Sequence, residues 1–547
     1  LVFDFKGNYF RKSATDSTFG ASITHAATTN ATMVDSDGLL KWRPHNLLTQ
    51  SNTFDTWSGG NGFLVTAKNA TGPDGVANTA DTITFNATSS NVYRLSFLSF
   101  SAGDKVTIAL WVRSDTLTTL QVSFNGRVSG ANNYLGGTVA VTSTWALVSV
   151  ESTIVGNDSG LYFILGNNSS IGPTTVGTFE AYGAHMFRSD LGGMVNNPDR
   201  GDSYVPTTTT PVYLSRRGHH IYNGSAWVNE GILHESEART NLYLKSNQFV
   251  SPWSLIDSTV TASAGTSPTG LADAWRWVGN GTSILYQGTT YVAGDYTVSA
   301  WVKSNGAGED TFRLYGLNSL ISGDFTATSE WVRYSYTFTS ALVGSRFSGL
   351  VYGSSQGNVD LLVYGLQIEA GATPSSYIPT AGASVTRAAE TLTVPAANLP
   401  YDSTNMSIQI DGKMTYADTG LTSSTRFIRW VQNATNYIQT VVQTNGSYEG
   451  RLRFTQRESI SGLEEIGTTG TYFTPDTNVP FNIASRHGST FLNGAEGGTA
   501  LTADTTPTAL AGLSSTDLLL CDTFMGTIGQ FRIWSDDLGD VGITEAT

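Results

Sequence analysis

An internal repeat constrains the fold of this chain more than any other feature, because a repeated unit must fold as a domain or stack on its copy. The segment NLLTQSNTF (46–54) returns as NLYLKSNQF (241–249), an offset of 195 residues. The markers that follow in the same order are PDGVA (73–77) and PTGLA (268–272), AGDKVTIALWVRSD (102–115) and AGDYTVSAWVKSN (293–305), Trp145 and Trp331, Tyr182-Gly183 and Tyr364-Gly365, and SYVPT (203–207) and SYIPT (376–380). This order predicts two copies of one domain.

The most regular segments of the repeat alternate apolar and polar residues with a period of two. In VTIALWVRS (106–114), Ile108, Leu110 and Val112 share one face, and YTVSAWVKS (296–304) repeats the pattern. This alternation is typical of antiparallel sheets with one buried face. Gly, Asn, Asp and Ser separate the runs, and no segment sustains a helical period. The sequence therefore predicts an all-β chain of tandem antiparallel β-sandwiches of the jelly-roll type.

The pattern changes after TRAAE (386–390). Beyond it, MSIQI (406–410) and GQFRIW (529–534) look like strands but copy none of the earlier markers, which predicts a third sandwich. The predicted segments are a lead-in at 1–45, copy 1 at 46–207, a connector at 208–240, copy 2 at 241–390 and the third sandwich at 391–547.

Charge and cysteine content exclude several classes of partner. With 30 Lys and Arg against 44 Asp and Glu, the net charge is −14, so neither nucleic acid nor an anionic membrane is an expected partner. The single cysteine, Cys521, excludes an intrachain disulfide and a cysteine-based zinc site. No apolar run is long enough for a transmembrane helix, and residues 1–20 lack the apolar core of a signal peptide. We expect assembly in a reducing cytosol, without membrane insertion.

Two tryptophans are candidates for carbohydrate binding. Sugar sites combine a flat aromatic ring with hydroxyl, amide or charged partners. Trp301 lies on the strand face opposite the predicted core, together with Lys303, and Trp111 shares its face with Arg113. We predict these four residues as a carbohydrate-binding set. The alternative is that each ring packs beneath a neighbouring loop or domain.

Candidates for catalysis are weak. Glycan hydrolysis needs two carboxylates about 5–10 Å apart, whereas neighbours on a strand point to opposite faces. We interpret the available pairs as solvated or capping groups, namely Glu464-Glu465, Asp536-Asp537 and Asp35/Asp37. No nucleophile elbow lies near any histidine, and we expect the pair His219-His220 to pack at a seam. No catalytic residue is assigned, and we expect the chain not to be an enzyme.

Metal binding has one candidate. PDG (73–75) and nearby Asn and Asp side chains offer oxygen ligands to a structural calcium, but copy 2 has Thr269 at the position of Asp74. No metal ligand and no cofactor is assigned, and a structural calcium stays open as an alternative.

Several of these segments resemble virion proteins of tailed bacteriophages that carry tandem carbohydrate-binding-module-like sandwiches. The residues that carry the resemblance are RRGHHIYNGSAWVNEG (216–231), EARTNLYLKSNQF (237–249), YGLQIEAG (364–371) and SSYIPTAGASVTRAAE (375–390). The third domain resembles a concanavalin A/laminin-G-type jelly roll in FNIASRHGSTFLNG (481–494) and GTIGQFRIWSDDLGD (526–540).

The resemblance implies a tail fibre or head fibre, a structural protein of the virion surface that is assembled in the cytoplasm of a host bacterium. Its expected role is host adhesion, with the receptor a host-surface polysaccharide or lipopolysaccharide. The expected partners are other virion proteins and copies of the chain itself in a homotrimer, with residues 1–45 anchoring it to the particle. The alternatives are a purely structural capsid-decoration protein and a polysaccharide-degrading tailspike.

Overall fold

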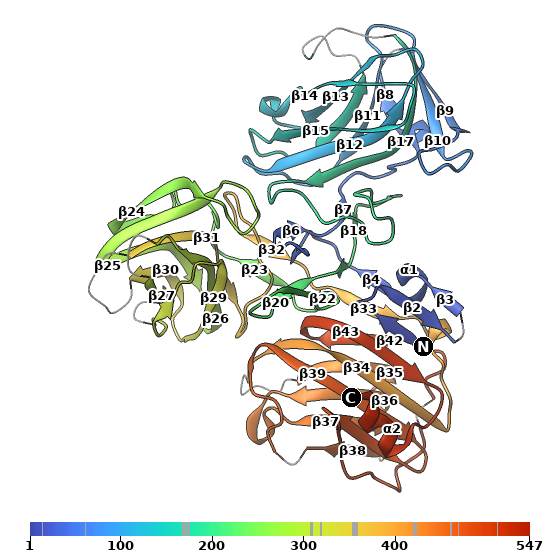
Figure 1. The fold of residues 1–547 in the computed structure, drawn as a ribbon, viewed down its shortest axis with the longest axis vertical. Coiled ribbons are helices and arrows are strands. Elements are labelled where there is room, and N and C mark those ends of the chain that lie inside the picture. The colour runs from blue at the N-terminus through green and yellow to red at the C-terminus, as the bar shows by residue number, and fades with distance from the viewer. Residues whose placement is uncertain are drawn as a thin grey trace. The chain divides into compact units, whose positions relative to one another are not determined.

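The computed structural model confirms the predicted all-β fold, with antiparallel sheets that form tandem sandwiches (Figure 1). The chain forms two compact units, one of residues Lys41–Leu214 and one that combines Leu1–Leu40 with Ser215–Thr547. The structure describes residues 1–13, 15–60, 62–166, 171, 176–306, 310–317, 320–352, 359–418, 424–459, 462–468, 470–510 and 512–547.

Copy 1 is a sandwich of two five-stranded sheets within the first of these units. One sheet has the order β15 (Ala146–Thr153), β12 (Lys105–Arg113), β17 (Gly177–Arg188), β10 (Ala80–Phe85), β9 (Phe63–Ala70). The other has the order β14 (Leu135–Ala140), β13 (Thr119–Gly126), β16 (Leu161–Gly166), β11 (Asn91–Ser96), β8 (Ser58–Gly59). Ile108, Leu110 and Val112 lie in the core between them. The face predicted from alternation is the buried face.

Copy 2 is built from one eight-stranded sheet. Its order is β28 (Phe325–Thr326), β27 (Thr311–Tyr315), β30 (Gly344–Tyr352), β25 (Ala274–Tyr291), β31 (Val359–Ala370), β26 (Gly294–Ser304), β29 (Val332–Ser340), and β24 (Ser254–Gly265) also pairs with β25. The long β25 pairs first with β31 and then with β30. In copy 1 the corresponding residues form two separate strands, β10 and β11, one in each sheet. Val298, Ala300 and Val302 are fully buried in the core.

The strand register confirms that the two copies are equivalent. Trp111 on β12 pairs with Tyr182 on β17, and Trp301 on β26 pairs with Tyr364 on β31. A register shift immediately precedes the tryptophan in both copies. The two tryptophans therefore occupy the same strand position, as the repeat predicts.

Hydrogen bonds that tie the start of each copy to its end also recur. The side-chain amide of Asn46 donates to the carbonyl of Val205 at 2.8 Å. Asn241 donates to the carbonyl of Ile378 at 2.9 Å. The other equivalent pairs are the hydroxyls of Ser51 with Tyr204 and of Ser246 with Tyr377, and the indole N–H groups of Trp57 with the Gln50 carbonyl and of Trp253 with the Lys245 carbonyl.

The third sandwich uses residues from three distant parts of the chain. One sheet has the order β3 (Thr15–Ser17), β2 (Tyr9–Lys12), β1 (Val2–Asp4), β43 (Met525–Trp534), β34 (Asn405–Tyr416), β39 (Asp476–Gly488), β40 (Leu492–Glu496), β41 (Thr499–Ala500), with β22 (Ile232–Glu235) on β43 and β19 (Arg216–Arg217) on β22. The facing sheet has the order β38 (Leu463–Gly467), β37 (Leu452–Arg457), β36 (Asn436–Gln443), β35 (Ser424–Asn433), β42 (Leu518–Thr523), β33 (Thr391–Val394), β4 (Thr24–Ala26).

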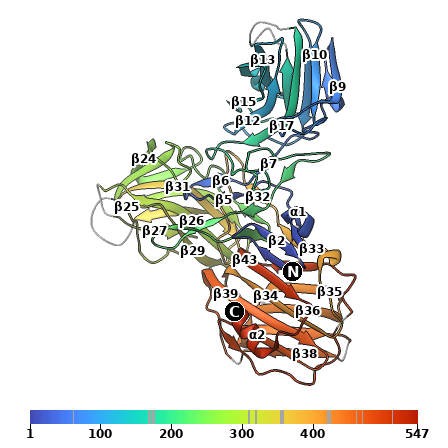
Figure 2. The same ribbon diagram turned by 45° about the vertical axis from the view of Figure 1, so that its right-hand side comes forward.

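The position of the N-terminal segment differs from the predicted separate lead-in. β1 pairs with β43 through Val2 and Arg532, and Phe3 packs on Phe531 with ring centroids 5.8 Å apart. Figure 2 shows the dark blue β2 close to the red β43. The apolar residues of LVFDF (1–5) find a core only in a distant strand, so residues 1–26 extend the third sandwich. Their role as a particle anchor stays a prediction.

The remaining elements are short. They are α1 (Phe19–Ser22), β5 (Thr32–Val34), β6 (Leu40–Trp42), β7 (His45–Asn46), η1 (Phe54–Thr56), η2 (Gly130–Asn132), β18 (Val212–Tyr213), β20 (His220–Tyr222), β21 (Trp227–Asn229), β23 (Arg239–Asn241), β32 (Val385–Arg387), η3 (Ala396–Asn398), η4 (Gly446–Tyr448) and α2 (Gly539–Ala546). In the part of the chain that the structure describes, every helix is too short or too polar to cross a bilayer.

Candidate functional site

Trp301 lies on the outer face of copy 2, as predicted, but other side chains contact its ring. The Arg333 guanidinium lies 4.6 Å from the ring centroid, and the Tyr377 ring meets it edge-on at 5.3 Å. Lys303 lies two residues further along β26, where its cross-strand neighbour is Leu362. Trp301 is therefore part of a packed cluster rather than a bare platform, and its predicted role in binding stays a prediction.

Trp111 has a similar position in copy 1. It packs against the cluster that contains Tyr182 and Tyr204. Arg113 pairs with Glu180 at 2.5 Å and lies over the Trp145 ring at 5.1 Å. Arg113 thus contacts Glu180 and Trp145, and the predicted role of Trp111 and Arg113 in binding sugars stays a prediction.

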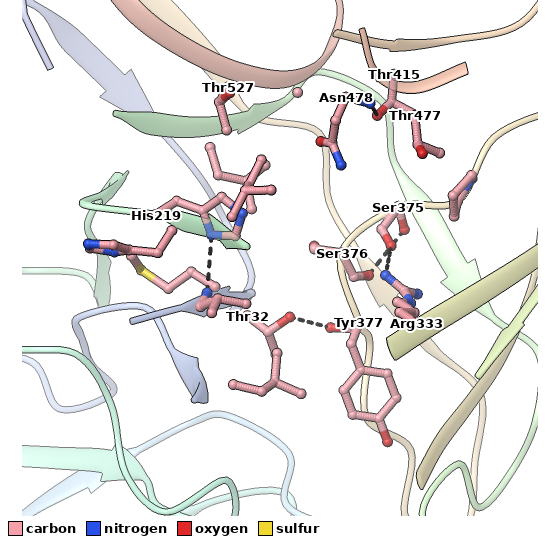
Figure 3. Close-up of a pocket in the computed structure, with 18 of the residues that line it drawn as sticks. Thr32, His219, Arg333, Ser375, Ser376, Tyr377, Thr415, Thr477, Asn478 and Thr527 are labelled. Carbon is pink, nitrogen blue, oxygen red and sulfur yellow. Dashed lines mark hydrogen bonds between the residues drawn. The ribbon is translucent and has the colours of Figure 1, made fainter. Parts of the chain in front are cut away.

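A cavity of about 430 Å³ opens beside Trp301. Its walls come from β5 and the β20–β21 hairpin, from β29 and the segment 374–377 of copy 2, and from β34, β39 and β43 of the third sandwich. Figure 3 shows His219 and Thr32 opposite Arg333, Ser375 and Ser376, with Thr415, Thr477 and Asn478 at a further wall. The volume lies in the range of small-molecule sites, roughly 300–1,000 Å³.

Aromatic rings and neutral polar groups line most of this cavity. Trp227 and Tyr222 line it while they are 39% and 47% exposed, so they lie where it opens to solvent. Trp331, immediately before β29, also lines the cavity, and its indole N–H donates to the Thr266 carbonyl at 2.9 Å. Hydroxyl and amide groups include those of Ser335 and Asn478. Such a lining suits a ligand with both C–H faces and hydroxyls.

Arg333 brings a positive charge to the cavity. Its guanidinium donates to the Ser375 carbonyl at 2.6 Å and to the Ser299 hydroxyl at 2.9 Å. Burial lowers the pKa of Arg333, although Glu369 and Glu235 act against this shift. The cation is therefore held by neutral oxygens, and nearby carboxylates only partly offset its desolvation.

Glu235 also lines the cavity, but its charge is already paired. Its carboxylate lies 2.7 Å from Arg216 and 3.1 Å from Arg387, and the Ser376 hydroxyl and N–H donate to it. Although burial alone would raise it, these partners hold the pKa of Glu235 well below its usual range. Glu390 pairs with Arg216 at 2.7 Å, so the two arginines and two carboxylates balance. This network joins the connector, copy 2 and the chain leading to the third sandwich.

His219 contributes a neutral ring. It accepts a hydrogen bond from the Val34 N–H at 3.1 Å (Figure 3), and burial lowers its pKa to about 3, with a smaller contribution from Arg216. The predicted packing of His219 at a seam is confirmed, since it lines the cavity between copy 2 and the third sandwich. A neutral, buried imidazole leaves Arg333 as the positive group that faces the ligand space.

A second candidate site was not predicted from the sequence. Tyr93 on β11 and Tyr162 on β16 form a diagonal cross-strand pair in copy 1, with ring centroids 5.5 Å apart. Tyr286 on β25 and Phe347 on β30 form the same diagonal pair in copy 2 at 4.8 Å. Both pairs lie on the outer face of the sheet, because Val92, Phe163 and Leu285 beside them point into the core and Ser348, next to Phe347, is fully buried.

The hydrogen bonds of the next residues show that these two pairs are equivalent. Arg94, after Tyr93, donates to the side chain of Thr49 at 2.9 Å. Gln287, after Tyr286, accepts from the backbone N–H of Leu244, which is the repeat partner of Thr49. The alternation of NVYRLS and LYFILG contained this signal, but recognising the pair required the cross-strand register.

Hydroxyl groups surround the pair in copy 2. Phe347 is 54% exposed. The cross-strand register puts Ser254 opposite Tyr286, and Thr290 opposite Ser345, on the same sheet face. All three hydroxyl-bearing side chains are exposed. Exposed rings beside hydroxyls can bind the C–H face and the hydroxyls of a sugar together.

One carboxylate of each candidate pair has a structural partner. Asp35 accepts from the backbone N–H groups of Asp37 and Leu39, which confirms its capping role in a turn. Glu465 pairs with Arg453, and Asp537 with Arg486.

The calcium candidate forms an ordinary turn. The Asp74 carboxylate accepts from the Val76 N–H and the Thr79 hydroxyl, both at 3.0 Å. Within the described ranges, no group of three or more His, Cys, Asp or Glu side chains is arranged to hold a metal ion.

No protein-family model matches the chain, and no curated protein matches it. Among solved structures, the CBM40 of the Ruminococcus gnavus IT-sialidase bound to α2,3-sialyllactose is similar at 12% identity and TM-score 0.22, over 26% of this chain and 82% of that one. The CBM22 tandem domain of Paenibacillus barcinonensis Xyn10C is similar at 10% identity and TM-score 0.21, over 63% and 100%. Domains LG4-5 of the mouse laminin α1 chain are similar at 7% identity and TM-score 0.19, over 54% and 88%. At these values the similarity concerns the fold alone.

Proposed function

We propose that this chain is a bacteriophage virion surface protein, a tail fibre or head fibre, which binds host-surface glycans and is not an enzyme. The observation that carries the glycan-binding part is the recurrence of one outward-facing, partly exposed aromatic pair at the same strand position in both copies. The virion part rests on the sequence segments that resemble phage structural proteins, above all SSYIPTAGASVTRAAE (375–390).

The recurrence matters because the surrounding residues have changed. On the strand that holds the second ring, copy 1 has Tyr162 and Ile164 where copy 2 has Phe347 and Gly349. A cross-strand aromatic pair stabilises a sheet by only about 0.2–1 kcal/mol, which is a weak reason to keep two rings on the solvent-facing side. Sugar stacking on both copies supplies a stronger reason, because each copy then carries one site.

Weak sites become effective when they are multiplied. Two equivalent sites on one chain, and more on the homotrimer that we propose, raise the effective concentration of binding groups at a polysaccharide surface. Binding of the whole assembly then exceeds the affinity of one site by orders of magnitude, roughly 10²–10⁴.

The full chain should be tested on an array of bacterial polysaccharides and lipopolysaccharides, with its oligomeric state measured by sedimentation. We expect retention on a subset of glycans, no release of reducing sugars, and a trimer. Release of reducing sugars would favour the tailspike alternative. Absence of retention on every glycan, together with incorporation into particles, would favour the purely structural alternative.

A further inference from the structure

Arg333 is unusual because its charge has no anionic partner at hydrogen-bond distance among the described residues. Both groups that accept from it, the Ser375 carbonyl and the Ser299 hydroxyl, are neutral. Its Nε–H is shielded from solvent and has no hydrogen-bond partner in the described part of the chain. Removing even part of a guanidinium from water is costly unless an anion compensates the charge.

The neighbouring carboxylates are already engaged. Glu235 is paired with Arg216 and Arg387. Glu369 accepts from the Gln367 amide at 2.7 Å and from the Ser375 hydroxyl at 2.6 Å. Neither forms an ion pair with Arg333 within the ranges that the structure describes.

The sandwich fold does not require this arginine. In copy 1 the residue opposite Trp111 is Leu147, whereas in copy 2 the residue opposite Trp301 is Arg333. The same strand position thus holds an apolar side chain in one copy and a cation in the other. The difference coincides with the copy whose outer face lines the cavity.

The rest of the cavity fits a sugar ring. Trp331, Trp227 and Tyr222 supply aromatic surface, and Ser335 and Asn478 supply hydroxyl and amide groups. We propose that this cavity binds an acidic sugar of the uronic-acid class, with the ligand carboxylate on Arg333. A guanidinium binds a planar carboxylate through charge-assisted hydrogen bonds, and the rings and hydroxyls complement the remainder of the sugar. The site is distinct from the aromatic pairs and does not rest on the function proposed for them.

The test uses two probes that differ only at the charged group. Calorimetric titration of the full chain with methyl glucuronide and with methyl glucoside compares a carboxylate with a hydroxymethyl group. We expect the glucuronide to bind at least about tenfold more tightly, since a hydrogen bond to a charged group is worth that much. Equal affinities, or no binding of the glucuronide, would overturn the proposal.

Variants assign the effect to Arg333. Arg333→Leu installs the residue that copy 1 carries, and we expect it to remove the preference for the glucuronide. Arg429→Leu is the matched control, because Arg429 is a partly exposed arginine of the third sandwich that pairs with Asp522. A preference that survives Arg333→Leu would contradict the assignment.

A measurement on the unaltered chain covers the case in which Arg333→Leu does not fold. A glucuronide that carries a photoreactive diazirine should label segments 331–335 or 374–377, and free methyl glucuronide should compete. Labelling confined to β25 and β30 would place the acidic sugar on the aromatic pair instead and would refute the cavity site, while leaving the proposed glycan binding intact.

Discussion

Copy 1 and copy 2 share a scaffold and differ on one face. Both copies keep the hydrogen bond donated by a side-chain amide, that of Asn46 or of Asn241. They also keep the strand register around Trp111 and Trp301. Several positions on the outer face differ, among them Glu180 and Leu147 of copy 1, which correspond to Leu362 and Arg333 of copy 2. The contacts that close the sandwich are therefore the same in both copies, whereas the residues of the outer face differ. In copy 2 that face meets the connector and the cavity.

Burying a charge in the shared core gives the largest expected effect. Val112→Asp and Val302→Asp each place a carboxylate at a fully buried, equivalent position. We expect each to destabilise its own sandwich by about 4 kcal/mol or more, because the charge has no partner there. Hydrogen exchange measured by mass spectrometry resolves the two copies. If one variant lost protection in its own copy while the other variant kept protection in its own copy, the two positions would not be equivalent.

Disrupting the ion-pair network around Glu235 should destabilise the protein almost as much, but only in copy 2 and the connector. Glu235→Gln leaves Arg216 and Arg387 without their shared partner. Removing one member of a buried ion pair costs about 3–5 kcal/mol. We expect faster exchange in copy 2 and the connector, and unchanged exchange in residues 46–207. Destabilisation of copy 1 to the same extent would contradict this account.

Trp301→Ala tests whether the ring acts mainly in packing or in binding. The loss of its contacts with Arg333 and Tyr377 should cost about 2 kcal/mol. We expect the sandwich to stay folded and adsorption to host cells to weaken. If Trp301→Ala unfolds copy 2 as completely as Val302→Asp, or leaves adsorption intact, the predicted binding role of Trp301 is wrong.

Mild acid should destabilise both units, and the larger one more. Burial holds the pKa of five histidines below their usual range, at about 3 for His219, His234, His487 and His45 and about 4 for His185. Below pH 6.5 the unfolded chain takes up protons that the folded chain does not. The free energy of unfolding therefore decreases as the pH is lowered, by up to about 1.4 kcal/mol per pH unit for each histidine.

Three of these histidines lie in the unit that contains copy 2, and two in the unit of copy 1. Denaturation monitored by hydrogen exchange between pH 6.5 and pH 5.5 should show the steeper slope in the former. His234→Gln serves as the control and should flatten that slope alone. Equal slopes before and after the substitution would show that His234 does not titrate as described.

The outer-face ion pair of copy 1 should have the smallest effect. Arg113 and Glu180 are both partly exposed, and such pairs contribute about 0–1 kcal/mol. Glu180→Leu, which installs the residue of copy 2, should therefore change the denaturation midpoint of copy 1 only slightly. A loss as large as that from Glu235→Gln would mean that the outer face of copy 1 is also part of its scaffold.

Local pattern was enough to predict part of this structure. Alternation placed Val302 in the core and Trp301 on the opposite face, and the repeat placed both tryptophans at one strand position. Partners that are far apart in sequence were not predictable. The pairing of Val2 with Arg532 joins the two ends of the chain, and no local pattern encodes it. The covering of Trp301 by Arg333 depends on strand register in the same way.

The candidate sites show the same division. Aromatic residues such as Tyr286 and Phe347 are visible in the sequence, but their pairing follows only from the antiparallel register of β25 and β30. Arg333 lacks an ion pair because Glu235 and Glu369 bind other side chains instead. These are properties of the packed structure, so the sequence indicated the sandwich fold but not both of the proposed sugar sites.

Removing both aromatic pairs tests the central claim of glycan binding most directly. The full chain with Tyr93, Tyr162, Tyr286 and Phe347 all replaced by Ala should be compared with the unaltered chain on the same immobilised host glycan, with Tyr134→Ala and Tyr448→Ala as exposed-tyrosine controls. We expect loss of one pair to weaken binding about tenfold and loss of both pairs to weaken it much further, while the controls bind normally. Undiminished binding by the folded four-residue variant would contradict the account.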